Sequence, residues 1–477
     1  MSVEMSGTRL LAPYFGTSLF VWTNVIGVIM MALTLGYALG GKMADRHPHA
    51  MLYFFWIGVT GIWVMGIPFL AALILPPLSH GFGDLENSLR LGSLAAVLLL
   101  LAFPMVLLGM VVPFTVRLMA EKIQNIGTLS GRVSAISAMG SLLGTFSPAF
   151  ILIPTLGTTK TFIFIGLSLC FLAACGLRNI FLMILTVLGG GLFWLVPPVY
   201  AAANVVASME SPYGFVFVTE NGRGVRALHI DTALGTQSFY DPENILPPES
   251  YYYGYFGVLP TMVEDAKTVL ILGHAGGSFT RIFNEYYPEL EITGIEIDPV
   301  VTQIAQEKMG MDHAQVEIIH ADARQFLLNT DQKYDLILVD AYHGANIPAH
   351  LATVEFFRLC QERLNEGGLV ALNAASTTGD FLDTLRNSLA ASFPSVLSFA
   401  IPGSFNSVLV ARDEPEEVKI FFETPPPDLQ SFYAQLFLPE KWLRSFYQES
   451  MPTFHDEKLS EVELKNEKMF MQLLSTF

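Results

Sequence analysis

The stretch Val269-Leu270-Ile271-Leu272-Gly273-His274-Ala275-Gly276-Gly277 decides the fold of the second half of this chain. Four consecutive aliphatic residues are typical of a short strand that is buried on both faces. The glycines that follow permit a tight turn and the close approach of a ligand to the backbone. The stretch therefore predicts a buried strand that ends in a ligand-binding turn.

Further apolar runs around this stretch alternate with helical patterns. Because strand, helix and strand in repetition give parallel strands joined by right-handed crossovers, we expect an α/β fold with a parallel sheet and helices on both of its faces. The expected strands are 268–272, 291–295, 316–319, 336–339, 369–372 and 408–411. The expected helices are 276–287, 299–308, 323–329, 352–364 and 379–392.

Acidic residues follow successive strands of this pattern. Glu296 and Asp298 follow the second strand, Asp322 follows the third and Asp340 the fourth. Ala323 comes directly after Asp322, and Tyr342 lies two residues after Asp340. Glu296 lies 23 residues after Gly273, a distance at which an acid takes ribose hydroxyls. Helix capping alone would not place acids at strand after strand. The pattern predicts a nucleoside site at the carboxyl ends of the strands.

Residues from about 211 to 412 resemble the spermidine synthase (aminopropyltransferase) branch of the Rossmann-like methyltransferase superfamily, and the whole chain resembles its membrane-fused variety. The resemblance implies an enzyme whose donor is S-adenosylmethionine or its decarboxylated form, with no metal. It implies donor contacts from Gln237, Gly273, His274, Ala275, Gly277, Glu296, Asp298, Asp322 and Ala323. It also implies that Asp340 is catalytic, with Tyr342 and Tyr252 shaping the pocket.

Three acids that this family uses for its amine substrate are absent, and Gly254, Gly276 and His343 occupy their positions. A polyamine carries two or more positive charges, whose burial requires convergent carboxylates. We therefore expect an acceptor other than a standard diamine, bound near Tyr253, Gly276 and His343. Since Gly276 removes a negative charge and His274 or His343 could pair with a carboxylate, we hypothesise that the donor is intact S-adenosylmethionine.

The first 208 residues differ sharply in composition from the remainder. The chain has 477 residues, 52% of them hydrophobic and 14% charged, whereas a soluble domain is about a quarter charged. Up to residue 208 there are 9 Lys and Arg against 5 Asp and Glu, and after it 17 against 38. Six segments have the roughly 20 apolar residues that a membrane span requires. They are 15–40, 51–76, 91–116, 134–155, 159–177 and 179–199.

These patterns predict four parts: a multi-pass helical membrane domain at 1–208 in contact with lipid, a small antiparallel β subdomain at 209–250, the Rossmann-like domain at 251–424 and a helical appendage at 425–477. The acidic second half excludes nucleic acid as a partner. The three cysteines form no metal-binding or disulfide pattern. A small-molecule substrate is expected, and a homodimer stays open.

Location in the inner cell membrane follows from the spans, but the side of the soluble part stays open. Six Lys and Arg residues in the loops on one face against three on the other favour an extracytoplasmic soluble part, whereas the supply of the donor favours the cytoplasm.

The leading interpretation is a membrane-anchored transferase of the spermidine synthase type that releases methylthioadenosine. One alternative is a methyltransferase or a lyase that acts on intact S-adenosylmethionine. Another is a transporter or sensor whose soluble part only binds nucleoside.

Overall fold

The computed structural model describes the whole chain except residues 16–18, 81–87, 121–125, 193–203, 232–234, 343–345, 377–378, 414–422, 437, 439–440 and 475–477. The chain divides into two compact units. The first comprises Met1–Ala203, Met209–Phe215 and Asp231–Ala233. The second comprises Asn204–Ser208, Val216–Ile230 and Leu234–Phe477.

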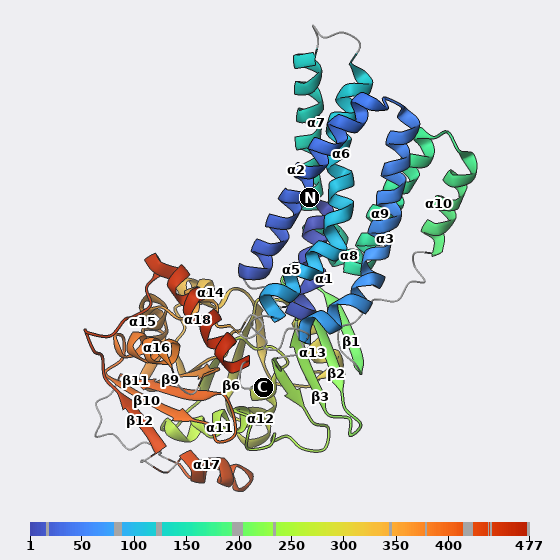
Figure 1. Cartoon of the computed structure of the whole chain (residues 1–477). Helices are drawn as coiled ribbons and strands as arrows, with labels where there is room; N and C mark the ends of the chain where they lie inside the picture. Colours follow the sequence, from blue (N-terminus) through green and yellow to red (C-terminus); the bar gives the residue numbers. More distant parts are fainter. Residues whose placement is uncertain are drawn as a thin grey trace. The chain divides into compact units, whose positions relative to one another are not determined.

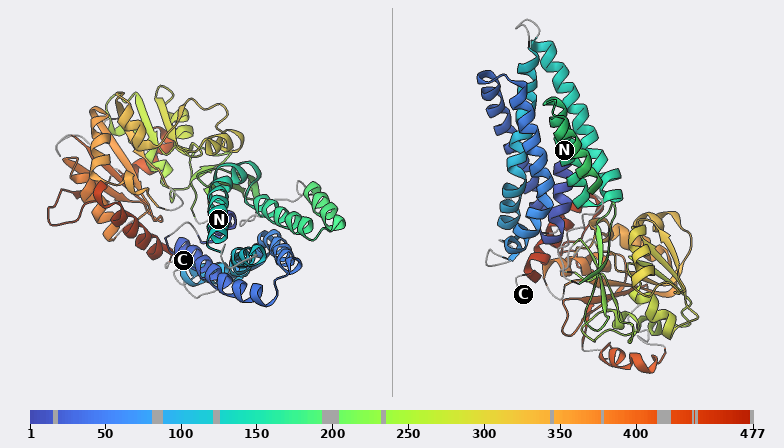
Figure 2. Two further views of the ribbon diagram at one scale, coloured as in Figure 1. Left: turned by 90° about the horizontal axis from the view of Figure 1, so that it is seen from above. Right: turned by 90° about the vertical axis from the view of Figure 1, so that its right-hand side faces the viewer.

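The first unit is helical, and its long helices lie side by side (Figures 1 and 2). Within the described residues, five helical runs are long and apolar enough to cross a membrane: Phe20–Arg46, Ala50–Ser79, Arg90–Met119, Gly127–Leu156 and Thr158–Gly176. The elements that form them are α2 (Leu19–Arg46), α3 (Ala50–His80), η1 (Ser88–Gly92), α5 (Ser93–Val97), η2 (Leu98–Ala102), α6 (Phe103–Met119), α7 (Ile126–Ser147), η4 (Pro148–Leu152), α8 (Ile153–Leu156) and α9 (Thr158–Gly176).

Two details of the predicted spans change. The chain begins with a separate helix, α1 (Ser2–Phe15), and the first long helix starts only at Leu19. The sixth expected span, 179–199, corresponds to α10 (Ile180–Leu192), and its remaining residues lie outside the described part of the chain. The 13 described residues of α10 extend over about 20 Å, which is less than the hydrocarbon core of a bilayer. The described residues thus contain five long apolar helices, where the sequence predicts six spans.

Glycines lie at close helix contacts of the first unit. A Cβ on Gly36 of α2 would lie 2.2 Å from the carbonyl oxygen of Val106 in α6. A Cβ on Gly61 of α3 would lie 2.6 Å from the Sγ of Cys170 in α9. Small residues allow such close approach of backbones, which is a main source of attraction between helices in an apolar environment.

The second unit is built on an eight-stranded sheet in the order β12-β10-β11-β9-β8-β5-β6-β7. Its strands are β5 (Thr268–Leu272), β6 (Glu291–Glu296), β7 (Glu317–His320), β8 (Tyr334–Val339), β9 (Leu364–Ala374), β10 (Ser395–Ala400), β11 (Ser407–Arg412) and β12 (Trp442–Ser445). The strands from β5 to β9 pair in parallel, and β11, β10 and β12 extend the sheet in antiparallel fashion. The crossover helices are α12 (Ser278–Tyr286), α13 (Pro299–Lys308), α14 (Ala323–Asn329), α15 (Val354–Glu362) and α16 (Asp380–Ala390).

The predicted α/β fold is confirmed, with every expected strand and crossover helix present. Alternate residues of β5 pack into different cores: Leu270 and Leu272 belong to one hydrophobic cluster, and Val269 and Ile271 to the other. Because successive strand residues point to opposite faces, the sheet is covered on both sides. The direction of the chain across the sheet reverses between β5 and β8, which is where ligands bind in such folds.

The remaining elements flank this sheet. The small antiparallel sheet is β1 (Val205–Glu210), β2 (Phe215–Glu220), β3 (Arg226–Ile230) and β4 (Ser238–Tyr240), followed by α11 (Tyr253–Phe256) and η6 (Leu259–Met262). A 3-10 turn, η7 (Ala349–Leu351), precedes α15, and the C-terminal segment holds η8 (Pro427–Leu429), α17 (Gln430–Leu436), η10 (Asp456–Lys458) and α18 (Leu459–Leu474). That segment contributes Phe432 to one hydrophobic cluster and Phe454 to the other.

We predict that Gly36→Ala destabilises the helical unit by about 1–3 kcal/mol, because a Cβ there meets backbone that cannot move away freely. Gly27→Ala is the matched control, since Gly27 lies on the same helix with nothing within 4 Å of an added Cβ. Thermal unfolding of the full chain in detergent measures the difference. Equal melting temperatures for the two variants would contradict the proposed close contact of α2 with α6.

Candidate functional site

The glycine turn after β5 lies against the end of β8. Gly273 has φ +93°, and a Cβ on it would lie 2.6 Å from the Asp340 carbonyl oxygen. The backbone N–H of Asp340 donates to the carbonyl of Leu272 at 2.8 Å. Gly277 ends the turn at φ +77° and precedes α12. The fold thus brings the predicted donor-binding turn and the predicted catalytic acid together.

Glu296 ends β6 directly beside this turn. Its Oε2 accepts a hydrogen bond from the backbone N–H of Ala275 at 2.9 Å, and its Oε1 accepts from Asp298 N–H at 3.0 Å. Burial raises the pKa of Glu296 to about 7, although both backbone hydrogen bonds oppose the rise. Asp298 caps α13, since its carboxylate accepts from Val300 N–H at 3.0 Å. Glu296 is therefore fixed to the turn, whereas Asp298 organises the helix that follows.

The His274 side chain points into the core of the second unit. Its Nε2 lies 2.9 Å from Thr280 Oγ1, and a Cβ on Gly294 of β6 would meet its ring at 2.5 Å. Burial lowers the pKa of His274 to about 4, so the ring is neutral at pH 7. A neutral ring can offer a donor carboxylate a hydrogen bond but no ion pair, so the pairing of His274 with a donor carboxylate stays a prediction.

Gly276 lies against a residue of the small sheet, Ser238. The Ser238 Oγ accepts from Gly276 N–H at 2.8 Å, and a Cβ on Gly276 would lie 2.6 Å from the Ser238 Cβ. Gln237, the neighbour of Ser238, donates its backbone N–H to Leu228 within the same sheet. Where the family has an acid, this turn is covered by a serine on β4.

Asp340 follows β8 and is held by two side chains from other parts of the chain. Tyr252 donates its hydroxyl to Oδ2 of Asp340 at 2.9 Å, and Asn373 of β9 donates Nδ2–H to Oδ1 at 2.7 Å. Burial raises the pKa of Asp340 to about 7, although both hydrogen bonds oppose the rise. A carboxylate with a pKa near neutrality can accept a proton at physiological pH and release it again.

Two asparagines of this cluster carry no signal in the sequence. Asn373 is 2% exposed, and its Oδ1 accepts from Asn406 Nδ2–H at 2.8 Å. Tyr342 donates its hydroxyl to the Asn373 carbonyl at 2.8 Å and accepts from Ala375 N–H at 2.9 Å. Asn373 of β9 thus links the catalytic candidate to Asn406, directly before β11, and Tyr342 braces the end of β9.

Asp322 caps the helix after β7. Its Oδ1 accepts from Gln325 N–H at 3.0 Å, and its Oδ2 lies 2.9 Å from His350 Nε2. Burial alone would raise the pKa of Asp322, but these hydrogen bonds lower it below the usual value. Ala323 is buried directly after it, at the start of α14.

Of the three residues expected around the second substrate, the structure describes Tyr253 and Gly276. Tyr253 is 2% exposed, and its ring centroid lies 4.1 Å from that of Tyr252. A Cβ on Gly254, where the family has an acid, would lie 2.3 Å from the ring of Phe432 in α17. His343 lies outside the described residues. The position of one absent acid is therefore closed by an aromatic ring from the C-terminal segment.

Comparison with known proteins places this geometry in a family. The pattern of the spermine/spermidine synthase domain matches residues 251–401. A probable polyamine aminopropyl transferase of Bifidobacterium longum is 30% identical over 214 residues, which are 44% of this chain and 43% of that protein. The polyamine aminopropyltransferase of Vibrio vulnificus is 32% identical over 244 residues, which are 49% of this chain and 77% of that protein.

Among solved structures, a probable spermidine synthase from Corynebacterium glutamicum has a TM-score of 0.41 and 19% identity, covering 52% of this chain and 96% of that chain. The chain spans less than half the length of the Bifidobacterium longum relative. Since 77% of the Vibrio vulnificus protein is matched at 32% identity, the chain belongs to the spermine/spermidine synthase family.

Proposed function

We propose that the second unit transfers an aminopropyl-type group from an S-adenosylmethionine-class donor to a nucleophile and releases methylthioadenosine. The observation that carries this proposal is the Asp340 carboxylate, held by Tyr252 and Asn373 directly beside the glycine turn. Membership of the family supports the same reaction class. The donor nucleoside would lie between the turn, Glu296 and Asp322.

The chemistry needs little beyond position and a proton acceptor. The nucleophile's lone pair forms a bond to the carbon next to the sulfonium, and the C–S bond breaks with its electrons moving to sulfur. The leaving group is then a neutral thioether and needs no acid. An amine must lose its proton to attack, and Asp340 is the group proposed to accept it.

The acceptor is proposed to be something other than a standard diamine. Phe432 fills the space beside Gly254, and Ser238 fills the space beside Gly276, so neither position can hold an acid without rearrangement. Two buried ammonium groups would need more than one compensating carboxylate. Asp340 with its pKa near 7 supplies at most one negative charge.

The covered turn at Gly276 also favours a second candidate, an enzyme that acts on intact S-adenosylmethionine as a lyase or methyltransferase. Ser238 presents a neutral hydroxyl there and accepts from the backbone. A donor that keeps its carboxylate would meet no negative charge at this point. The absence of a carboxylate at 276 therefore removes a barrier to the intact donor.

The first unit is proposed to anchor the enzyme in a membrane, in contact with lipid. Five described helical runs have the length and composition that a span requires. Insertion would confine turnover to the membrane surface.

Product analysis tests the proposed reaction. Purified full chain is incubated with intact or decarboxylated S-adenosylmethionine, with and without putrescine, and products are identified by mass spectrometry. Methylthioadenosine that forms only with an added nucleophile supports transfer. S-adenosylhomocysteine, or methylthioadenosine without any acceptor, would replace transfer by methylation or by cleavage. Binding without any product would leave a sensor or transporter.

We predict that Asp340→Asn lowers turnover by at least about 100-fold, because the proton acceptor is lost. Donor affinity, measured by calorimetry, should stay within a few-fold of wild type, since the glycine turn and Glu296 are untouched. A parallel loss of affinity and turnover would make Asp340 a structural residue.

We predict that kcat/KM declines as the pH falls through about 7, where Asp340 takes up a proton. Asn373→Ala removes a hydrogen bond that lowers the pKa of Asp340, so the acid limb of the profile should move to higher pH by about one unit. Asn365→Ala is the matched control, because Asn365 makes the same kind of bond to Asp335 at the start of β8. An equal shift in both variants, or none in either, would refute the positioning role of Asn373.

A further inference from the structure

Residues 346–351, between β8 and α15, are held at both ends by side chains from elsewhere in the second unit. Asn466 of α18 donates Nδ2–H to the carbonyl of Ile347 at 2.7 Å. Arg324 of α14 donates Nη1–H to the carbonyl of His350 at 3.1 Å. The His350 ring then reaches Asp322 at 2.9 Å. The donor-site acid is thus connected to the C-terminal helix through a short run of backbone.

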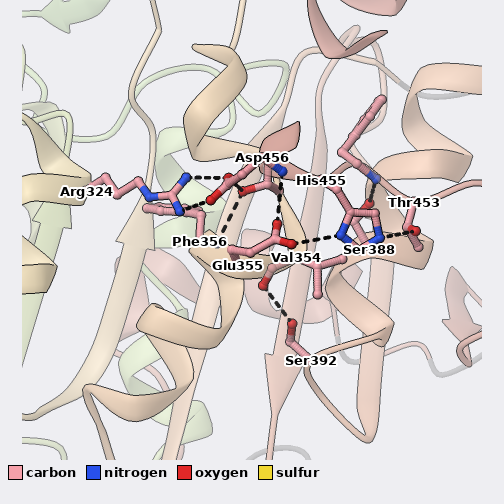
Figure 3. A network of polar contacts seen from close by, with 11 residues as sticks. Arg324, Val354, Glu355, Phe356, Ser388, Ser392, Thr453, His455 and Asp456 are labelled. Carbon is pink, nitrogen blue, oxygen red and sulfur yellow. Dashed lines mark hydrogen bonds and ion pairs between the residues drawn. The ribbon is translucent and has the colours of Figure 1, made fainter. Parts of the chain in front are cut away.

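Arg324 is itself held by an acid of the C-terminal segment, Asp456. The two side chains pair through both guanidinium Nη atoms, with Nη1 at 2.6 Å from Oδ1 (Figure 3). Such two-point pairs fix geometry as well as charge. The Arg324 side chain is 16% exposed, so solvent screens the pair only in part. Thr353 adds a hydroxyl hydrogen bond to Asp456 at 2.8 Å.

The backbone around Asp456 is fixed independently of Arg324. His455 Nδ1 lies 2.9 Å from Oε1 of Glu355, and Thr453 Oγ1 lies 3.0 Å from the other ring nitrogen, as Figure 3 shows. Asn387 of α16 donates to the backbone carbonyls of residues 448, 451 and 452. Asp456 therefore presents its carboxylate to Arg324 from a segment that is hydrogen-bonded to α15 and α16, and its own N–H donates to Oε2 of Glu355 at 3.2 Å.

The geometry points to the C-terminal segment as a positioning element of the donor site, acting through Asp456 and Asn466. Asp456 orients Arg324, which with Asn466 fixes residues 346–351 and so holds His350 against Oδ2 of Asp322. The other carboxylate oxygen of Asp322 is already used by the helix cap, so Oδ2 is the oxygen left to orient. The inference rests on the proposed assignment of Asp322 to the donor nucleoside.

Asp456→Asn tests this role in the full chain. The substitution keeps the size of the side chain and removes the charge that pairs with Arg324. We expect the Kd for methylthioadenosine, measured by calorimetry, to rise about tenfold while kcat at saturating donor stays within twofold. We also expect faster amide hydrogen exchange at residues 349–352 without any ligand.

Lys465→Ala is the matched control. Lys465 lies on α18, the helix of Asn466, and contacts Asp380 and Thr384. These contacts take no part in the connections from Asp456 or Asn466 to Asp322. We expect Lys465→Ala to lower the melting temperature about as much as Asp456→Asn does. The Kd for methylthioadenosine and the amide exchange at residues 349–352 should stay unchanged. His350→Ala should raise the Kd about as much as Asp456→Asn does. The double variant should have a Kd close to that of either single variant, because both substitutions break the same chain of contacts to Asp322.

Two outcomes separate the proposals. Unchanged exchange at 349–352 in Asp456→Asn, or an equal change of Kd in Lys465→Ala, would overturn the positioning role. If wild-type protein binds neither methylthioadenosine nor S-adenosylmethionine, the proposed function fails, while the exchange experiment still decides whether Asp456 fixes residues 346–351.

Discussion

The Asp340 carboxylate follows a strand that is almost fully buried, so the protein itself must solvate much of its charge. Tyr252 and Asn373 do so by donating to one carboxylate oxygen each. Tyr252 approaches from the segment before β5, and Asn373 lies on the neighbouring strand, β9. Their positions are set by the order of strands in the sheet, and burial keeps the pKa of Asp340 near 7 despite both bonds.

The parallel sheet could be predicted because each of its strands can be recognised from its own residues. Each strand from β5 to β9 is an apolar run bounded by turn residues, and the glycine turn marks where the first of them ends. The strands β10 (Ser395–Ala400) and β12 (Trp442–Ser445) escaped prediction. Trp442–Ser445 has only four residues and becomes a strand through pairing with β10, more than 40 residues earlier in the chain. Such pairing leaves no periodic pattern in a short segment.

The candidate site also has one part that the sequence predicts and another that it does not. The turn and the acids at the strand ends could be read from spacing, since parallel strands bring their carboxyl ends to one edge. Asn373, Ser238 and Phe432 could not, because each acts on a residue far away in the sequence. An asparagine or serine in a strand looks like any other until its partner is placed. The burial of His274, invisible in the sequence, lowers the pKa of its ring, and its pairing with a donor carboxylate stays a prediction.

Gly254 and Gly276, where the resemblance to the family implies acids, are packing positions. The ring of Phe432 comes from a helix near the C-terminus, and Ser238 comes from the sheet before the Rossmann-like domain. Each would clash with any side chain added at Gly254 or Gly276. An acid at either position would therefore need a second change at the neighbour that fills the space. The side chains that could stand at residues 254 and 276 are thus limited by the packing of segments far away in the sequence.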